Sequence, residues 1–315
     1  MRVPASLLVA LAIVGIGISV KVVPSVFTVD DVNYLVNVVA VRSGGLRVSN
    51  TEGLTPSREL LFFDPTATTR EVTSTPVASS APALYGLLAL PFSWFGWRGL
   101  VGLNTLAYLA TVLIVFLYSQ RFATTQLTPW LAAGAFALGG FALEYSQGVW
   151  PHALSFALCT GGIVAAGMSI DRGRHVAAVA AGVLLATAAG LRYQNAVIVA
   201  AVGAGLLLLA QDRLRAVAAF AAGTAVPLST SAFINHVRLD SWNPISKGSG
   251  YLNVPLAVDS SAWSDPFVML WAQTVDYSAR PRLSGPDVDS WLHYDLTTGA
   301  HLILNAFAKC HQAQE

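Results

Sequence analysis

Seven stretches of the sequence are apolar over about the length that a helix needs to cross a lipid bilayer. A hydrocarbon core of about 30 Å is spanned by roughly 20 residues of α-helix. By this measure the expected spans are Val3–Val23, Leu100–Ser119, Trp130–Tyr145, Ala153–Ile170, Val176–Leu191, Ala196–Ala210 and Ala216–Phe233. Lipid offers no hydrogen bonds to the backbone, so such stretches fold as helices. The sequence therefore predicts an all-α, polytopic transmembrane bundle of about seven spans.

The charge content agrees with a membrane protein. Only 11% of the residues are charged, against roughly 25% in soluble domains. The net charge is +1 and no basic patch is present, which excludes nucleic acid as a partner. The apolar stretch after Arg2 is longer than the core of a secretory signal, and no small-residue cleavage site follows it. We therefore expect it to be a first transmembrane helix, with a cleaved signal as the alternative.

The distribution of basic residues predicts the orientation. Three short connections carry them: Arg121 in the first, Arg172 and Arg174 in the second, Arg213 and Arg215 in the third. Connection 144–152 has none and connection 191–195 has one. Because basic loops stay in the cytoplasm, we expect a multi-pass protein of the plasma (inner) membrane with a cytoplasmic N-terminus. Residues 28–80 then form a long outer loop containing interfacial helices, and the tail from 235 is also outside.

One apolar segment, Ala83–Trp97, is too short for a span. It contains Pro91 and several aromatic residues, so we expect an interfacial or re-entrant helix.

An acidic pair, Asp30 and Asp31, directly follows the first expected span. Adjacent carboxylates near a low-dielectric region repel each other, which raises the pKa of at least one of them. Such a group suits a general base or a cation ligand. The alternative is an N-cap of a helix over residues 33–42.

Two connections at the expected outer face carry further polar groups. Glu144 and His152 flank one of them and could bind a polar head group, with Tyr145 and Trp150 as interfacial anchors. The alternative is a simple polar cap on a helical hairpin.

Arg192 directly follows the expected span Val176–Leu191 and precedes Tyr193. A guanidinium at the end of a span either snorkels towards water or binds an anion, and its planar fork fits a lipid phosphate. The segment around Lys247 has glycines on both sides of Ser249 and is either a flexible loop or part of the site.

In their order along the chain, these features resemble the lipid-dependent glycosyltransferases of the GT-C fold. That group includes the protein O-mannosyltransferases and the aminoarabinose transferases that act on lipid A. The matching positions are Asp30-Asp31, Tyr145-Ser146, Gly190–Arg192, Asn235, Arg238 and Gly250-Tyr251. The resemblance covers roughly residues 1–255, and no single motif in it is specific. It implies a catalytic transmembrane module over residues 1–235, including the outer loop 28–80, and an extracytoplasmic tail over 236–315.

The resemblance implies transfer of a sugar from a polyprenyl-phosphate donor to an outer glycan, lipid or protein acceptor, with inversion. Asp30 or Asp31 would be the catalytic base and would also hold a divalent cation if one is used. Donor phosphate and lipid would be bound by Arg192, Tyr193 and Lys247, and the acceptor and sugar by Glu144, His152 and Tyr251.

Two departures from the family stand out. The family's acidic pair is commonly Asp-Glu, and its members usually continue for several more spans, so the resemblance implies a truncated chain that is inactive alone. The competing classes are a transporter and a non-catalytic membrane scaffold. Transporters place charges or broken helices near the bilayer midplane, whereas these spans have apolar middles.

Overall fold

The computed structural model describes residues 3–21, 34, 37–38, 40–42, 45–46, 81–138 and 142–246. Regular structure in these ranges is helical: α1 (Ala5–Lys21), α3 (Leu84–Ser93), α4 (Gly96–Ser119), α5 (Thr128–Leu138), α6 (Ala142–Tyr145), α7 (His152–Arg172), α8 (His175–Leu191), η1 (Tyr193–Asn195), α9 (Ala196–Leu209) and α10 (Arg213–Leu239). No strand occurs in these ranges. The all-α prediction is confirmed for this part of the chain.

Three of the described helices are long and apolar enough to cross a membrane: Arg98–Ser119 within α4, the whole of α7, and the whole of α10. They correspond to three of the predicted spans, and they indicate a membrane protein. The other apolar helices are shorter, with 17 residues in α1 and α8, 14 in α9 and 11 in α5.

Two element boundaries differ from the sequence prediction. α10 continues six positions beyond the expected end at Phe233, to Leu239, so Asn235 and Arg238 lie in its last turns. The expected span Trp130–Tyr145 is covered by α5 and the four-residue α6, with residues 139–141 between them outside the described part.

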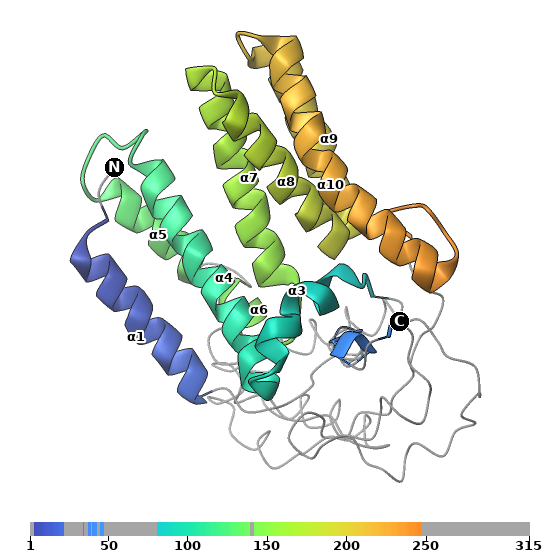
Figure 1. Cartoon of the computed structure of the whole chain (residues 1–315). Helices are drawn as coiled ribbons and strands as arrows, with labels where there is room; N and C mark the ends of the chain where they lie inside the picture. Colours follow the sequence, from blue (N-terminus) through green and yellow to red (C-terminus); the bar gives the residue numbers. More distant parts are fainter. Residues whose placement is uncertain are drawn as a thin grey trace, which may run out of the picture.

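Successive long helices run in alternating directions (Figure 1). One end of the bundle holds the start of α1 and the connections 120–127, 173–174 and 210–212; we call it the N-terminal end. An ion pair between Arg121 and Asp171 joins two of its segments. The other end holds α3 and the connections 146–151 and 192–195; we call it the α3 end. Asn37 and Arg42 are hydrogen-bonded to the carbonyls of Ala81 and Ser93 at this end.

At the N-terminal end, a glycine ends α7 and a side-chain cap begins α10. Gly173 closes α7 with φ 62°, a left-handed conformation that glycine adopts without strain. Asp212 caps α10 by accepting a hydrogen bond from the backbone N–H of Arg215.

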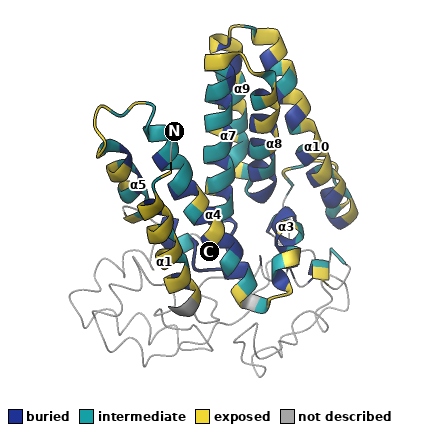
Figure 2. Cartoon of the chain, turned by 60° about the vertical axis from the view of Figure 1, so that its left-hand side comes forward, coloured by how far each residue is buried: buried dark blue, intermediate teal, exposed yellow. Residues whose placement is uncertain are grey.

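α8 packs between α7 and α10. Gly182 of α8 and Gly223 of α10 allow the close contact, because a Cβ on Gly182 would overlap the carbonyl oxygen of Phe220 and one on Gly223 that of Val179. Small residues serve the same purpose in membrane bundles generally. Many large apolar residues of α1, α5, α9 and α10 are exposed, as expected of helices that have lipid as their solvent. The exposed positions of these helices are yellow in Figure 2.

α3 is a separate helix of 10 residues that contains Pro91. It is shorter than a span, as predicted for Ala83–Trp97. The chain turns at Phe95 and Gly96, where Gly96 has φ 66°, and enters α4.

Candidate functional site

Buried polar side chains gather at the α3 end of the bundle. They are contributed by the 34–46 stretch, by α4, α6, α7 and α10, and by the connection after α6: Asn37, Asn104, Thr105, Glu144, Ser146, Gln147, Ser155, Ser231, Asn235 and Arg238. Burying such groups is costly unless each finds a hydrogen-bond partner. Their concentration at one end therefore reflects a specific tertiary network.

The connection after α6 is anchored to α4. The amide of Asn104 donates from Nδ2 to the carbonyl of Gly148 at 2.7 Å and to the hydroxyl of Tyr85 at 3.2 Å. The hydroxyl of Thr105 donates to the carbonyl of Ser146 at 3.2 Å. The connection is thus folded into the bundle, and its backbone is fixed by two neighbouring side chains of one helix.

Glu144 and His152 lie at the two ends of this connection, as the sequence predicted. Glu144 is 4% exposed and sits in α6, whereas His152 is half-buried at the start of α7. The ring of Tyr145 stacks on His152 with 4.2 Å between centroids, and Trp150 packs beside it at 5.2 Å. Trp150 is only 5% exposed. It therefore packs inside the protein, which differs from the interfacial anchor expected from sequence.

Arg192 lies in the turn between α8 and η1. Its backbone is extended, with φ −146° and ψ 110°, which ends α8. Asn195 fixes the turn by donating from Nδ2 to the hydroxyl of Ser155 on α7 at 2.7 Å and to the carbonyl of Ala188 at 2.8 Å. Arg192 is half-buried as a residue, and within the described part of the chain its guanidinium makes no hydrogen bond or ion pair. Tyr193 follows directly as the first residue of η1.

Arg238 is a buried cation at the α3 end that the sequence analysis did not place in the site. It is 1% exposed and donates from Nη1 to the carbonyl of Ala81 at 2.9 Å. Asn37 donates from Nδ2 to the same carbonyl at 3.1 Å and to that of Pro82 at 3.3 Å. This junction joins the end of α10 to the segment that leads into α3.

A sequence signal for Arg238 exists. Ser231, Asn235 and Arg238 are spaced i, i+4 and i+7, so they share one face of a helix. All three are buried in α10. The polarity of this face made the segment resemble a tail rather than the end of a span.

Four predicted site residues lie outside the described residues: Asp30, Asp31, Lys247 and Tyr251. α1 ends at Lys21, at the α3 end of the bundle (Figure 1). Among the described residues, no group of three or more His, Cys, Asp or Glu could hold a metal ion.

No protein-family model, curated protein or solved structure matches the chain.

Proposed function

We propose that the protein is an integral membrane glycosyltransferase that moves a sugar from a polyprenyl-phosphate donor to an extracytoplasmic acceptor. The observation that carries the proposal is the environment of Arg192. Arg192 is half-buried, and its guanidinium makes no hydrogen bond or ion pair within the described part of the chain. A cation withdrawn from water is costly without an anionic partner, and a guanidinium fork matches phosphate oxygens in pairs. A lipid phosphate at the end of the bundle is an anion that can reach it.

The proposal includes seven spans, with the N-terminal end in the cytoplasm and the α3 end outside. The basic residues of the short connections lie at the N-terminal end, which supports this orientation. The 17-residue helices α1 and α8 are at the lower limit for a span. α5 and α9 are shorter, so each would cross together with the residues next to it. Non-helical backbone in those residues is tolerated at membrane depth where protein surrounds it.

The chemistry follows from this placement. Asp30 or Asp31 takes the proton of an acceptor hydroxyl, and the oxygen attacks the anomeric carbon of the donor sugar from the face opposite the phosphate. The bond from that carbon to the phosphate oxygen breaks, and the polyprenyl phosphate leaves with both bonding electrons. Negative charge grows on the phosphate as it departs, so a cation aimed there stabilises the transition state more than the ground state.

Other residues at the α3 end would orient the two substrates. Glu144 and His152 are side chains whose chemistry suits sugar hydroxyls, together with Tyr251 from the following segment. Tyr193 and Lys247 would assist Arg192 at the phosphate and lipid.

The experiment that tests the proposal is a binding titration of the purified protein in detergent with a short-chain polyprenyl phosphate. Arg192→Ala should weaken binding by about tenfold or more, since hydrogen bonds to charged groups are worth about 1.5–3 kcal/mol. Arg192→Lys keeps the charge but loses the paired donors, so its affinity should fall between the two.

Arg172→Ala is the matched control, because Arg172 is an exposed arginine at the other end of the bundle. Unchanged affinity in both Arg192 variants would reduce Arg192 to a snorkelling anchor. Absence of saturable binding by the parent protein would remove the enzyme proposal and leave a transporter or a scaffold.

A further inference from the structure

Two connections at the N-terminal end of the bundle lie side by side, and exposed arginines are found at both. Connection 173–174 joins α7 to α8, and connection 210–212 joins α9 to α10 (Figure 1). They approach closely, because a Cβ on Gly173 would lie 4.0 Å from the side-chain oxygen of Gln211. Arg174 belongs to the first connection and Arg213 directly follows the second, and both are exposed. Positive charge from two helix pairs therefore meets on one surface.

The acidic residues described at this end already have cationic partners. Asp171 pairs with Arg121, and Asp212 pairs with Arg215 at 3.2 Å. The guanidinium groups of the two arginines named above make no hydrogen bond or ion pair within the described part of the chain. Among the described residues, the positive charge where the two connections meet is therefore uncompensated.

Helix stability does not account for the positions of Arg174 and Arg213. Arg174 precedes the first residue of α8 and makes no side-chain capping hydrogen bond, and Arg213 is the first residue of α10. A cation is unfavourable at a helix start and favourable at a helix end, where Arg172 closes α7. The orientation of the chain explains basic residues in these connections, but it does not require them at two helix starts. An anion bound by both side chains would offset this cost.

Large apolar side chains lie directly beside these arginines. Val176 and Leu214 are 81% and 77% exposed, and Leu209 at the end of α9 is also exposed. A small soluble anion would make no use of such neighbours. A phospholipid uses both, because its phosphate meets the guanidinium groups and its acyl chains cover the apolar side chains.

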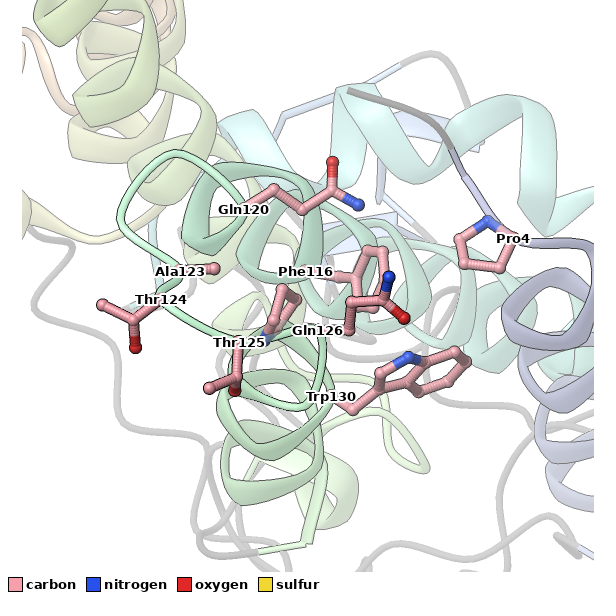
Figure 3. Close-up of a pocket in the computed structure, with 9 residues that line it drawn as sticks. Pro4, Phe116, Gln120, Ala123, Thr124, Thr125, Gln126 and Trp130 are labelled. Atoms are coloured by element: carbon pink, nitrogen blue, oxygen red, sulfur yellow. The ribbon is translucent and has the colours of Figure 1, made fainter.

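A pocket at the same end of the bundle is a separate feature (Figure 3). It has a volume of about 470 Å³ and is lined by residues of α4, α5 and connection 120–127, and by Pro4. The rings of Phe116 and Trp130 meet edge to face in its wall, with 5.1 Å between centroids. Neither Arg174 nor Arg213 lines it. A ligand of these two arginines therefore binds on the outer surface of the bundle.

We propose that Arg174 and Arg213 together bind the phosphate of an anionic bilayer phospholipid, whose acyl chains lie against the apolar side chains around Val176 and Leu214. The guanidinium groups are long enough to reach one head group from two adjacent connections. The lipid thereby ties the α7–α8 pair to the α9–α10 pair. This inference does not depend on the proposed glycosyltransferase activity, which is assigned to the other end of the bundle.

The test uses the whole chain in nanodiscs that contain equal amounts of phosphatidylethanolamine and phosphatidylglycerol. The lipid that stays on the protein is identified by native mass spectrometry, and we expect phosphatidylglycerol to be retained in preference. Arg174→Gln and Arg213→Gln should each lower its retention about fivefold, which corresponds to about 1 kcal/mol, as expected for one basic side chain at a membrane surface. Both residues are exposed, so the replacements should not impair folding.

Arg215→Gln is the matched control. It removes the same charge two residues from Arg213, but from an arginine that is paired with Asp212, so retention should change little. Arg192→Ala tests whether the retained lipid lies at the α3 end instead, and it should have no effect. Glycerol phosphate in solution should not displace the lipid.

Four results would each overturn the proposal. They are equal retention of the two lipids, equal effects of Arg213→Gln and Arg215→Gln, loss of phosphatidylglycerol in Arg192→Ala, and displacement of the lipid by glycerol phosphate. The last result would indicate a site for a soluble anion.

Discussion

The junction at Ala81 provides a quantitative test of the packing at the α3 end. The carbonyl of Ala81 accepts hydrogen bonds from the guanidinium of Arg238 and from the amide of Asn37. Arg238→Met removes the charged donor but keeps the unbranched side chain that fills the space. Asn37→Ala removes the neutral donor. If the two donors share one buried acceptor, losing both should cost more than the sum of the separate losses.

The magnitudes follow from the burial of the groups. A hydrogen bond from a charged group contributes about 1.5–3 kcal/mol. Arg238→Met also relieves the cost of keeping a cation away from water, so its net loss should be smaller, about 1–2 kcal/mol. Asn37→Ala should cost about 1–2 kcal/mol, since it loses neutral hydrogen bonds and leaves a small void. The two donors share one acceptor, so the double variant should show about 1–2 kcal/mol of coupling between the two sites.

Thermal unfolding in detergent can be followed by the reactivity of Cys159, which is buried in the folded protein, in a Cys310→Ser background. One kcal/mol shifts the midpoint of unfolding by about 2–4 °C in proteins of 150–250 residues, and by somewhat less in larger ones. Coupling should therefore lower the midpoint of the double variant by about 2–4 °C beyond the sum of the two single shifts. Arg215→Met is the matched control, because Arg215 lies on the same helix with its side chain 78% exposed, and it should change little.

Single shifts that add without coupling would refute the shared-acceptor argument. A shift for Arg238→Met as small as that for Arg215→Met would show that the buried arginine contributes nothing to the junction.

Three further predictions concern orientation, packing and chemistry. In a background without native cysteines, Ser57→Cys should react with an impermeant thiol reagent in intact cells, and Gly173→Cys only after permeabilisation; the reverse pattern would invert the proposed topology. Gly182→Ala should destabilise the fold by about 1–3 kcal/mol because its Cβ would overlap the α10 backbone, whereas Gly205→Ala, where a Cβ meets nothing within 4 Å, should not; equal midpoints of thermal unfolding would contradict the packing described. In a preparation that transfers sugar, Asp30→Asn and Asp31→Asn test the base, because asparagine keeps the N-cap and loses the proton acceptor. Transfer of a radiolabelled sugar should fall while donor binding is retained, and it should fall more for Asp30→Asn than for Asp31→Asn. Parental transfer rates in both variants would leave the pair as a cap.

Hydrophobic length was enough to predict the helical architecture. α4 and α7 follow the apolar runs closely, because a long run without charges has few stable folds other than a helix in lipid. The segment Ala83–Trp97 was also recognised as too short for a span. These features depend on local composition, which the sequence shows directly.

The differences arise where tertiary contacts compensate for polarity. The end of α10 was missed because Asn235 and Arg238 lower its hydropathy, whereas in the fold their side chains bond to the carbonyls of Asn243 and Ala81. Trp150 was expected at the interface because tryptophan is common there. In the fold it is buried, because Tyr145 and His152 pack around it, and these contacts are not visible in the sequence.

The position of Arg192 could be predicted from the sequence, but its environment could not. Arg192 could be found because an arginine at the end of an apolar run is unusual by itself. That its guanidinium makes no hydrogen bond or ion pair within the described residues is seen only in the fold.

The lipid that the protein carries from its own membrane tests the central claim most directly. The whole chain is purified in mild detergent, and its bound lipids are identified by mass spectrometry and compared with the total membrane extract. We predict that a polyprenyl phosphate or its sugar ester is enriched in the purified protein, and that Arg192→Ala abolishes the enrichment whereas Arg172→Ala preserves it. A parent protein that carries only ordinary phospholipids, with no enrichment of polyprenyl phosphate, would contradict the proposal that the α3 end is a donor site.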